Sequence, residues 1–139
     1  MNNKQQLGLN VRLHGTFDAA LAQTIEALKA EGFGVLTEID VKATMKAKLD
    51  VDFRPYRILG ACNPHLAHRA LTAAPAIGLM LPCNITVAEQ EDGSIEVAAV
   101  NLLAMMEVLP HPELERVAAE AHDKLKRVID SLEDQHAVI

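Results

Sequence analysis

Two cysteines stand in similar contexts in this chain, and they are the side chains best suited to chemistry. Cys62 occurs in the string GACNP and Cys83 in the string LPCN. A thiolate is a nucleophile and a ligand for soft metals, and a helix N-terminus favours the anionic form of a thiol. Because Asn63 suits the N-cap and Pro64 the first position of a helix, Cys62 is predicted to stand directly before one. It is therefore either a modestly activated thiol or a small buried side chain of the core.

Cys83 lies on a predicted strand, where side chains alternate between the two faces. It shares a face with Leu81, Ile85 and Val87, which indicates a core position, whereas Asn84 faces outward. The two thiols would approach each other if their strands were neighbours. A disulfide would then require Cα atoms closer than about 7 Å, and the sequence leaves that question open.

Cys62, His65 and His68 follow one another at steps of three and look like a series of metal ligands. A thiolate with imidazoles would suit zinc or copper. A structural zinc site, however, usually has four protein ligands in two close pairs, and the chain offers one cluster. We therefore expect no metal site, with His65 and His68 on the solvated side of the helix. The other histidines are scattered and predicted to lie at the surface (His14, His111, His122 and His136).

Glu38 is the carboxylate best placed for acid–base chemistry. It lies on a predicted strand, in the string TEID, on the face opposite Val35, Thr37 and Ile39. A carboxylate beside a cleft can act as a general base or hold a cationic ligand. The alternative is an outward-facing strand residue, with Asp40 as a simple cap for the next helix.

Arg57 and Asn84 are explained neither by a core position nor by a cap, and they could line one mouth with Glu38. A reactive Cys62 would also need a neighbouring cation, for which the nearby candidates are Arg54, Arg57 and Arg69. The candidate ligand-binding residues are therefore Cys62, Cys83, Glu38, Arg57 and Asn84. No catalytic residue and no cofactor is assigned.

The elements that must position these side chains follow from the hydrophobic periodicity. Alternation and β-branched runs predict strands over residues 7–13, 33–39, 56–62, 79–90 and 95–100, with an Asp92-Gly93 hairpin turn between the last two. Helices are predicted from a Thr16 cap to just before Gly32, over 41–49, over 64–74 and beyond Pro112. The last helix has a continuous apolar stripe of Leu114, Val117, Ala121, Leu125, Val128 and Leu132.

This order of elements predicts a single α+β domain over residues 1–139. Its antiparallel sheet has about five strands, covered by helices on one face. The formal charge of −6 and the 3% aromatic content argue against nucleic-acid binding. No apolar run reaches the roughly 20 residues of a membrane span, and no secretory signal is recognised at the start. Two cysteines do not make a disulfide scaffold, so we expect reduced thiols in a soluble cytoplasmic protein.

The segment GFGVLTEIDVKATMKAKLDVDFRPYRILGACNP, with the later strings IGLMLPCNITV and VAAVNLLAMM, resembles the family catalogued as domain of unknown function 302. The resemblance covers residues 32–106, and GACNP with LPCN is its most specific part. It implies a TBP-like domain of the β-α-β4-α type and a homodimer. Family members often carry Asp-Pro or Asn-Pro where this chain has Asn101-Leu102, so a turn there is expected to differ. The resemblance implies no agreed activity.

Two functions fit these observations. Because the sequence contains no complete catalytic constellation, we expect a non-catalytic domain that binds a small ligand or another protein. The alternative is a thiol-dependent redox or soft-metal-handling protein that uses Cys62, with or without Cys83. Whether the protein is an enzyme stays undecided, since Glu38 would also suit a small hydrolase or isomerase.

Overall fold

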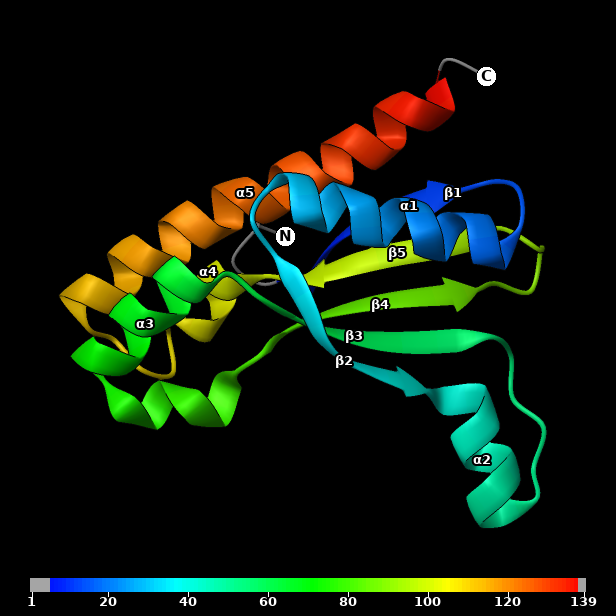
Figure 1. The fold of residues 1–139 in the computed structure, drawn as a ribbon, viewed down its shortest axis with the longest axis horizontal. Coiled ribbons are helices and arrows are strands. Elements are labelled where there is room, and N and C mark those ends of the chain that lie inside the picture. Colours follow the sequence, from blue (N-terminus) through cyan, green and yellow to red (C-terminus); the bar gives the residue numbers. More distant parts are fainter. Residues whose placement is uncertain (1–5, 138–139) are drawn as a thin grey trace.

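The computed structural model describes residues 6–137, with side chains up to residue 133. Five antiparallel strands form one sheet in the order β1-β5-β4-β3-β2. Two long helices, α1 (Phe17–Ala30) and α5 (Pro112–Ala137), pack on one face of this sheet (Figure 1). The predicted α+β class and the antiparallel sheet are thus confirmed. The strands are β1 (Gly8–Leu13), β2 (Gly34–Asp40), β3 (Tyr56–Cys62), β4 (Cys83–Glu89) and β5 (Ile95–Val100).

The core lies between the sheet and the two long helices. Strand residues such as Leu13, Leu59, Ile85 and Val97 are completely buried there, because alternate side chains of each strand point toward the helices. The stripe predicted on α5 is confirmed, since all of its members are buried: Leu114, Val117, Ala121, Leu125, Val128 and Leu132.

The predicted helix caps and turns are present. Thr16 Oγ1 accepts a hydrogen bond from the Ala19 backbone N–H at 3.1 Å, which starts α1. Asp40 Oδ1 accepts one from the Ala43 N–H at 2.9 Å, which starts α2 (Val41–Leu49). Gly32 and Gly93 have φ values of +85° and +87°, a backbone region that favours glycine at a helix end or in a hairpin turn.

The predicted strand over residues 79–90 is wrong in its first part. Residues Pro75–Met80 form a 3-10 helix, η2, and β4 begins only at Cys83, after a cis Leu81-Pro82 peptide bond. Pro82 has no N–H to donate to a strand ladder, which explains why pairing starts after it. A further element was not predicted: the short helix α4 (Leu102–Met105). Asn101 caps its start, since Asn101 Oδ1 accepts a hydrogen bond from the Leu103 N–H at 3.1 Å.

The register of β2 also differs from simple alternation. Val35 lies opposite Ala61 and Glu38 opposite Leu59, with an irregularity between Val35 and Thr37. Leu36 has no partner in this register, and the extra residue shifts the later part of the strand, as a β-bulge does. Glu38 therefore lies on the same sheet face as Val35, the face toward the helices, although the sequence had placed them on opposite faces.

α2 and the loop after it project from the body of the molecule beyond the end of β2 (Figure 1). Residues 41–55 are called the arm below. None of the α2 residues is buried, and α2 contacts β2 and β3. Within residues 6–137, no helix is both long enough and apolar enough to cross a membrane.

Candidate functional site

A pocket of about 320 Å³ lies at the end of the sheet where β3 ends and β4 begins. Its walls come from α3 (Pro64–Ala73), η2, α4 and the first part of α5, together with the ends of the strands. Apart from Asn63 and the two cysteines, every lining side chain is a hydrocarbon or a thioether. No charged side chain of residues 6–133 lines the pocket, so it is suited to an uncharged apolar molecule.

Both cysteines line this pocket, and both are free thiols. Cys83 is paired in register with Ala61, whereas Cys62, one residue further on, is paired with Gly34. Since successive strand residues point to opposite faces, the two cysteines approach the pocket from different sides of the sheet. Burial, with a smaller effect of Cys62, raises the pKa of Cys83 to about 11. Cys83 is therefore a protonated thiol at neutral pH and a poor nucleophile.

The string GACNP is largely explained by the way these elements meet. A Cβ added at Gly60 would lie 2.7 Å from Cγ of Pro82 and would also collide with the Thr37 side chain. Asn63 Oδ1 accepts a hydrogen bond from the Leu66 N–H at 3.4 Å, as a cap for α3. Its Nδ2 donates to the Glu31 carbonyl at 3.5 Å, which ties α3 to the end of α1. The motif thus builds the pocket wall through close packing and capping.

The arginines near Cys62 in sequence have other partners. Arg69 binds Glu113 Oε1 at 3.0 Å and Glu120 Oε2 at 2.8 Å, which joins α3 to α5. The Arg54 guanidinium lies 5.6 Å from the ring centroid of Phe53, within the arm. The cationic help that an activated Cys62 would need is therefore not supplied by these two residues.

Glu38 and Arg57 lie at the other end of the strands and form an ion pair with each other. Arg57 also binds Asp40 Oδ2 at 3.2 Å. None of these three residues lines the pocket, and Asn84 is exposed on the sheet face away from the helices. The structure therefore brings together Cys62 with Cys83 and Glu38 with Arg57, but it does not join all five candidates in one site.

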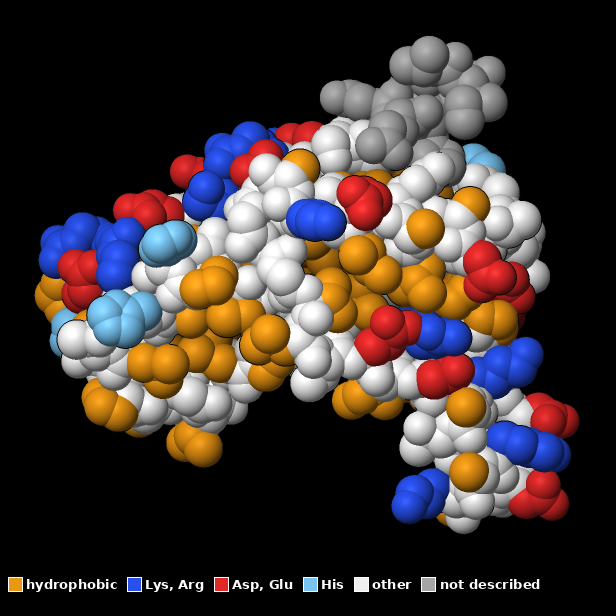
Figure 2. All heavy atoms as spheres, in the orientation of Figure 1, with side chains coloured by type: hydrophobic (Ala, Val, Ile, Leu, Met, Phe, Trp, Pro, Cys, Tyr) orange, Lys and Arg blue, Asp and Glu red, His pale blue; other side chains and the backbone are white. Residues whose placement is uncertain are grey.

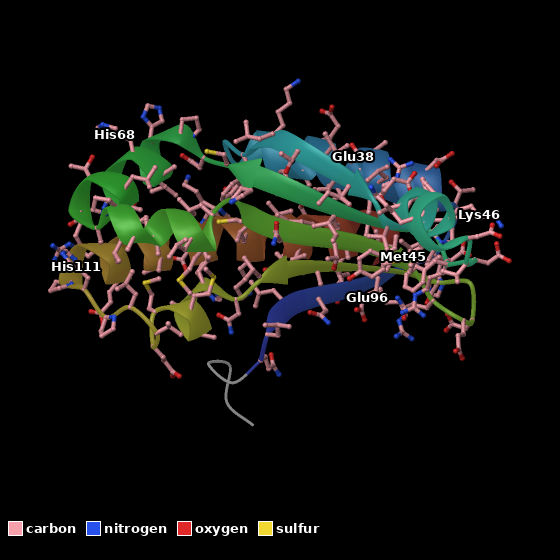
Figure 3. All side chains as sticks on the ribbon, turned by 90° about the horizontal axis from the view of Figure 1, so that it is seen from below. Glu38, Met45, Lys46, His68, Glu96 and His111 are labelled. Carbon is pink, nitrogen blue, oxygen red and sulfur yellow. The ribbon has the colours of Figure 1, made fainter. Side chains whose placement is uncertain are left out.

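Figure 3 shows the separation directly. His68 and His111 mark one end of the molecule, Met45 and Lys46 of α2 mark the other, and Glu38 lies between them on β2. His65 and His68 are exposed, as predicted. His111 is partly buried, and its Nδ1 accepts a hydrogen bond from the Glu113 N–H at 3.1 Å at the start of α5.

His122 is also partly buried, and the side chain of His136 lies outside the described part. Among residues 6–133, whose side chains are described, no group of three or more His, Cys, Asp or Glu is arranged to hold a metal ion.

The comparisons with known proteins place this fold in a family. The protein-family model described as "Domain of unknown function DUF302" matches residues 9–132 of this chain. The chain belongs to the DUF302 family. A crystal structure of an uncharacterized conserved DUF302 protein from Bacillus stearothermophilus has a TM-score of 0.83 at 28% sequence identity. The similarity covers 90% of this chain and 97% of the other.

A second relative of this DUF302 protein is an uncharacterized protein from Aquifex aeolicus. It is 28% identical over 114 residues, which are 77% of this chain and 79% of the relative. The family thus confirms the resemblance seen in GACNP and LPCN, and it carries no assigned activity.

Sequence reasoning identified the two thiols of the pocket but missed most of its wall. Leu36, Leu71, Met105 and Leu114 come from four elements that are far apart in the chain. Their apolar character was visible in the sequence, but any of them could equally have been an ordinary core residue. Only the three-dimensional arrangement shows that they surround a space.

Proposed function

We propose that this DUF302 protein is a non-catalytic domain that binds a small, uncharged apolar molecule in the pocket beside Cys62 and Cys83. The observation that carries the proposal is the pocket itself, about 320 Å³ in volume with an almost wholly apolar lining. Small-molecule sites typically have volumes of about 300–1,000 Å³ and are lined mainly by hydrophobic side chains. An ordinary close-packed core has few voids larger than a water molecule.

The polar groups of the lining support an uncharged ligand. Asn63 already accepts from the Leu66 N–H and donates to the Glu31 carbonyl. Burial keeps Cys83 protonated, because the pKa of its thiol is raised to about 11. A charged ligand group would lose its hydration without gaining an ionic partner, which is costly in an apolar site.

A homologous series of n-alkanols tests this proposal by thermal shift. The melting temperature should rise with chain length, because each buried methylene contributes about 0.8 kcal/mol of binding free energy, and the gain should stop when the pocket is full. The matched control is a carboxylic acid and an amine of the same chain length, which should stabilise less. A protein whose melting temperature responds to no alkanol, or equally to the charged analogues, would not have this function.

The presence of Cys62 in the pocket supports a second candidate, a thiol-dependent redox or soft-metal-handling role. Cys62 is the last residue of β3 and directly precedes the capped start of α3, where a helix dipole favours a thiolate. The rate of alkylation by iodoacetamide, measured against pH in a Cys83→Ser variant, tests this role. An apparent pKa well below about 8.5 supports an activated Cys62, whereas a value at or above it excludes one.

We further propose that the protein acts in the cytoplasm as a homodimer. The location is supported by the two free thiols, which persist best in a reducing compartment. The dimer is supported by the large apolar side chains that the arm, β2, α3 and η2 expose.

A further inference from the structure

We infer that the arm of one copy packs against the pocket rim of a second copy, so that each subunit covers its partner's pocket. The rim is defined as Leu36 of β2, Leu71 of α3 and Leu79 of η2, all of which are exposed. The inference rests on the proposed homodimer and names the surfaces that form it.

The arm packs little against the body of its own subunit, where α2 contacts β2 and β3. α2 has nine residues, none of them buried, and isolated helices of that length are marginal in water. Leu49, Val51 and Phe53 follow one another from the end of α2 into the loop after it, and all three are exposed, Leu49 to 65%. An element of this kind gains most of its stability from packing its apolar side chains against another surface.

The shape of the arm is nevertheless well defined by local contacts. Asp40 caps the start of α2. Lys46 Nζ binds Asp50 Oδ1 at 3.0 Å and Asp52 Oδ1 at 3.6 Å, which folds the chain back after the helix. The Phe53 ring lies edge-on to the ring of Tyr56, the first residue of β3, with the centroids 6.2 Å apart. A preformed surface loses little conformational entropy on docking, which favours its use as an interface.

The exposed apolar side chains are concentrated on one margin of the molecule. In the described part of the chain nine large hydrophobic residues are exposed, and seven of them belong to the arm, β2, α3 and η2. Figure 2 shows hydrophobic side chains on α3 and η2 and again on the arm, with a hollow outline between them. Exposed apolar side chains gathered in this way mark an interaction site. The seven residues are Leu36, Ile39, Leu49, Val51, Phe53, Leu71 and Leu79.

A second copy of this chain is the occupant that these features fit. Each copy carries both an apolar projection and an apolar rim, so a two-fold arrangement would form two identical arm–rim contacts. Charge also favours it, because the arm carries four Lys and Arg against two Asp in a chain whose formal charge is −6. The basic arm of one copy is therefore attracted to the acidic remainder of another.

The contact would also complete the pocket. Leu36 and Leu71 belong both to the rim and to the pocket lining, so an arm seated on them covers the pocket mouth. Ligand binding and dimerisation would then be linked: each would strengthen the other by the same factor.

Sedimentation velocity with complementary variants tests the arm–rim contact. The arm variant Leu49→Lys and the rim variant Leu79→Glu should each weaken the wild-type dimer at least about tenfold. Val108→Glu is the matched control, because Val108 is 74% exposed and belongs to neither the arm nor the rim, and it should leave the dimer unchanged. An equimolar mixture of the arm and rim variants should dimerise better than either alone, since it restores one intact contact and adds a Lys–Glu pair at the other.

The inference is overturned if the wild-type protein is monomeric across the micromolar range, or if the mixture dimerises no better than its components. The same variants separate this result from the proposed function when n-octanol binding is measured by calorimetry. If the arm and rim variants lose the dimer but the wild type binds no octanol, the interface is supported and the proposed ligand binding is contradicted. Octanol binding by a monomeric wild type supports the ligand and contradicts the interface.

Discussion

The two ends of this sheet differ in almost every physical respect. At the end where β3 meets α3, the side chains surround an apolar pocket that contains both cysteines. At the end where β2 meets α2, Arg57 binds Glu38 and Asp40 at the surface, and the arm extends away from the body. Arg57 and Cys62 belong to the same seven-residue strand, yet one is part of an ionic surface and the other faces an apolar space.

This difference separates the residues of the family segment into two groups. Cys62 and Cys83 line an apolar pocket, whereas Glu38 and Arg57 neutralise each other where the chain leaves the sheet. A general base at Glu38 would need a free carboxylate facing a substrate cleft, and its pairing with Arg57 leaves little reason for that role.

The largest contrast is expected from the same substitution at the two ends. Leu66→Ala removes a buried pocket-wall side chain and should lower the free energy of unfolding by about 2–5 kcal/mol. Leu49→Ala changes an exposed side chain of the arm and should cost less than about 0.5 kcal/mol in dilute solution. Urea denaturation measures both, and similar losses would mean that the arm is part of the cooperative core.

The pH dependence of stability should report on the pocket end through Cys83. Its pKa is raised to about 11 by burial, whereas an unfolded cysteine titrates near about 8.5. Between these values the unfolded chain binds fewer protons than the folded one, so the free energy of unfolding falls as pH rises. The loss should be at most about 3 kcal/mol.

Urea denaturation at about pH 8 and about pH 10 measures this loss. Cys83→Ala should remove most of the slope, whereas Cys62→Ala should leave it largely in place. Equal slopes in the wild type and the Cys83→Ala variant would show that Cys83 is not responsible.

A smaller effect is expected from the close packing beside the pocket. Gly60→Ala would push a methyl group against Pro82 and Thr37, and overpacking of this kind costs about 1–3 kcal/mol. Gly34→Ala is the matched control, because nothing lies within 4 Å of a Cβ at that position. Denaturation midpoints compare the two, and a fully stable Gly60→Ala protein would contradict the packing described here.

The smallest effect is expected at the ionic end. Glu38→Gln breaks the pair with Arg57, which is partly exposed, so stability should change by about 0–1 kcal/mol and the change should shrink at high salt. Urea denaturation at low and at high salt measures this change in stability. A loss of several kcal/mol, or one insensitive to salt, would show that Glu38 has a structural role that its surface ion pair does not explain.

Local chemistry made part of this fold predictable. The caps at Thr16, Asp40 and Asn63, the hairpin at Gly93 and the stripe on α5 all follow from interactions within a few residues, and each is present. The strands over 56–62 and 95–100 were predicted at their true bounds for the same reason, since alternation is a local signal.

The predictions that were wrong concern features that depend on tertiary contacts. Gly34 stands just before the irregularity of β2, but a glycine at the first residue of a strand does not show where the pairing shifts, so the face of Glu38 relative to Val35 could not be inferred. The apolar residues before Cys83 were indistinguishable from a strand, although they form η2. The pocket brings together residues from 33 to 121, and no periodicity in one segment reports on such a space.

The central claim is that the pocket beside Cys62 and Cys83 is a binding site, and calorimetric titration with n-octanol tests it most directly. Ala67→Phe fills the pocket from α3, whereas Ala119→Phe makes the same change at an exposed position of α5 that does not line it. The account predicts that octanol binds the wild-type and Ala119→Phe proteins alike and binds Ala67→Phe at least about tenfold more weakly. Equal binding by all three proteins, or no binding by the wild type, would contradict it.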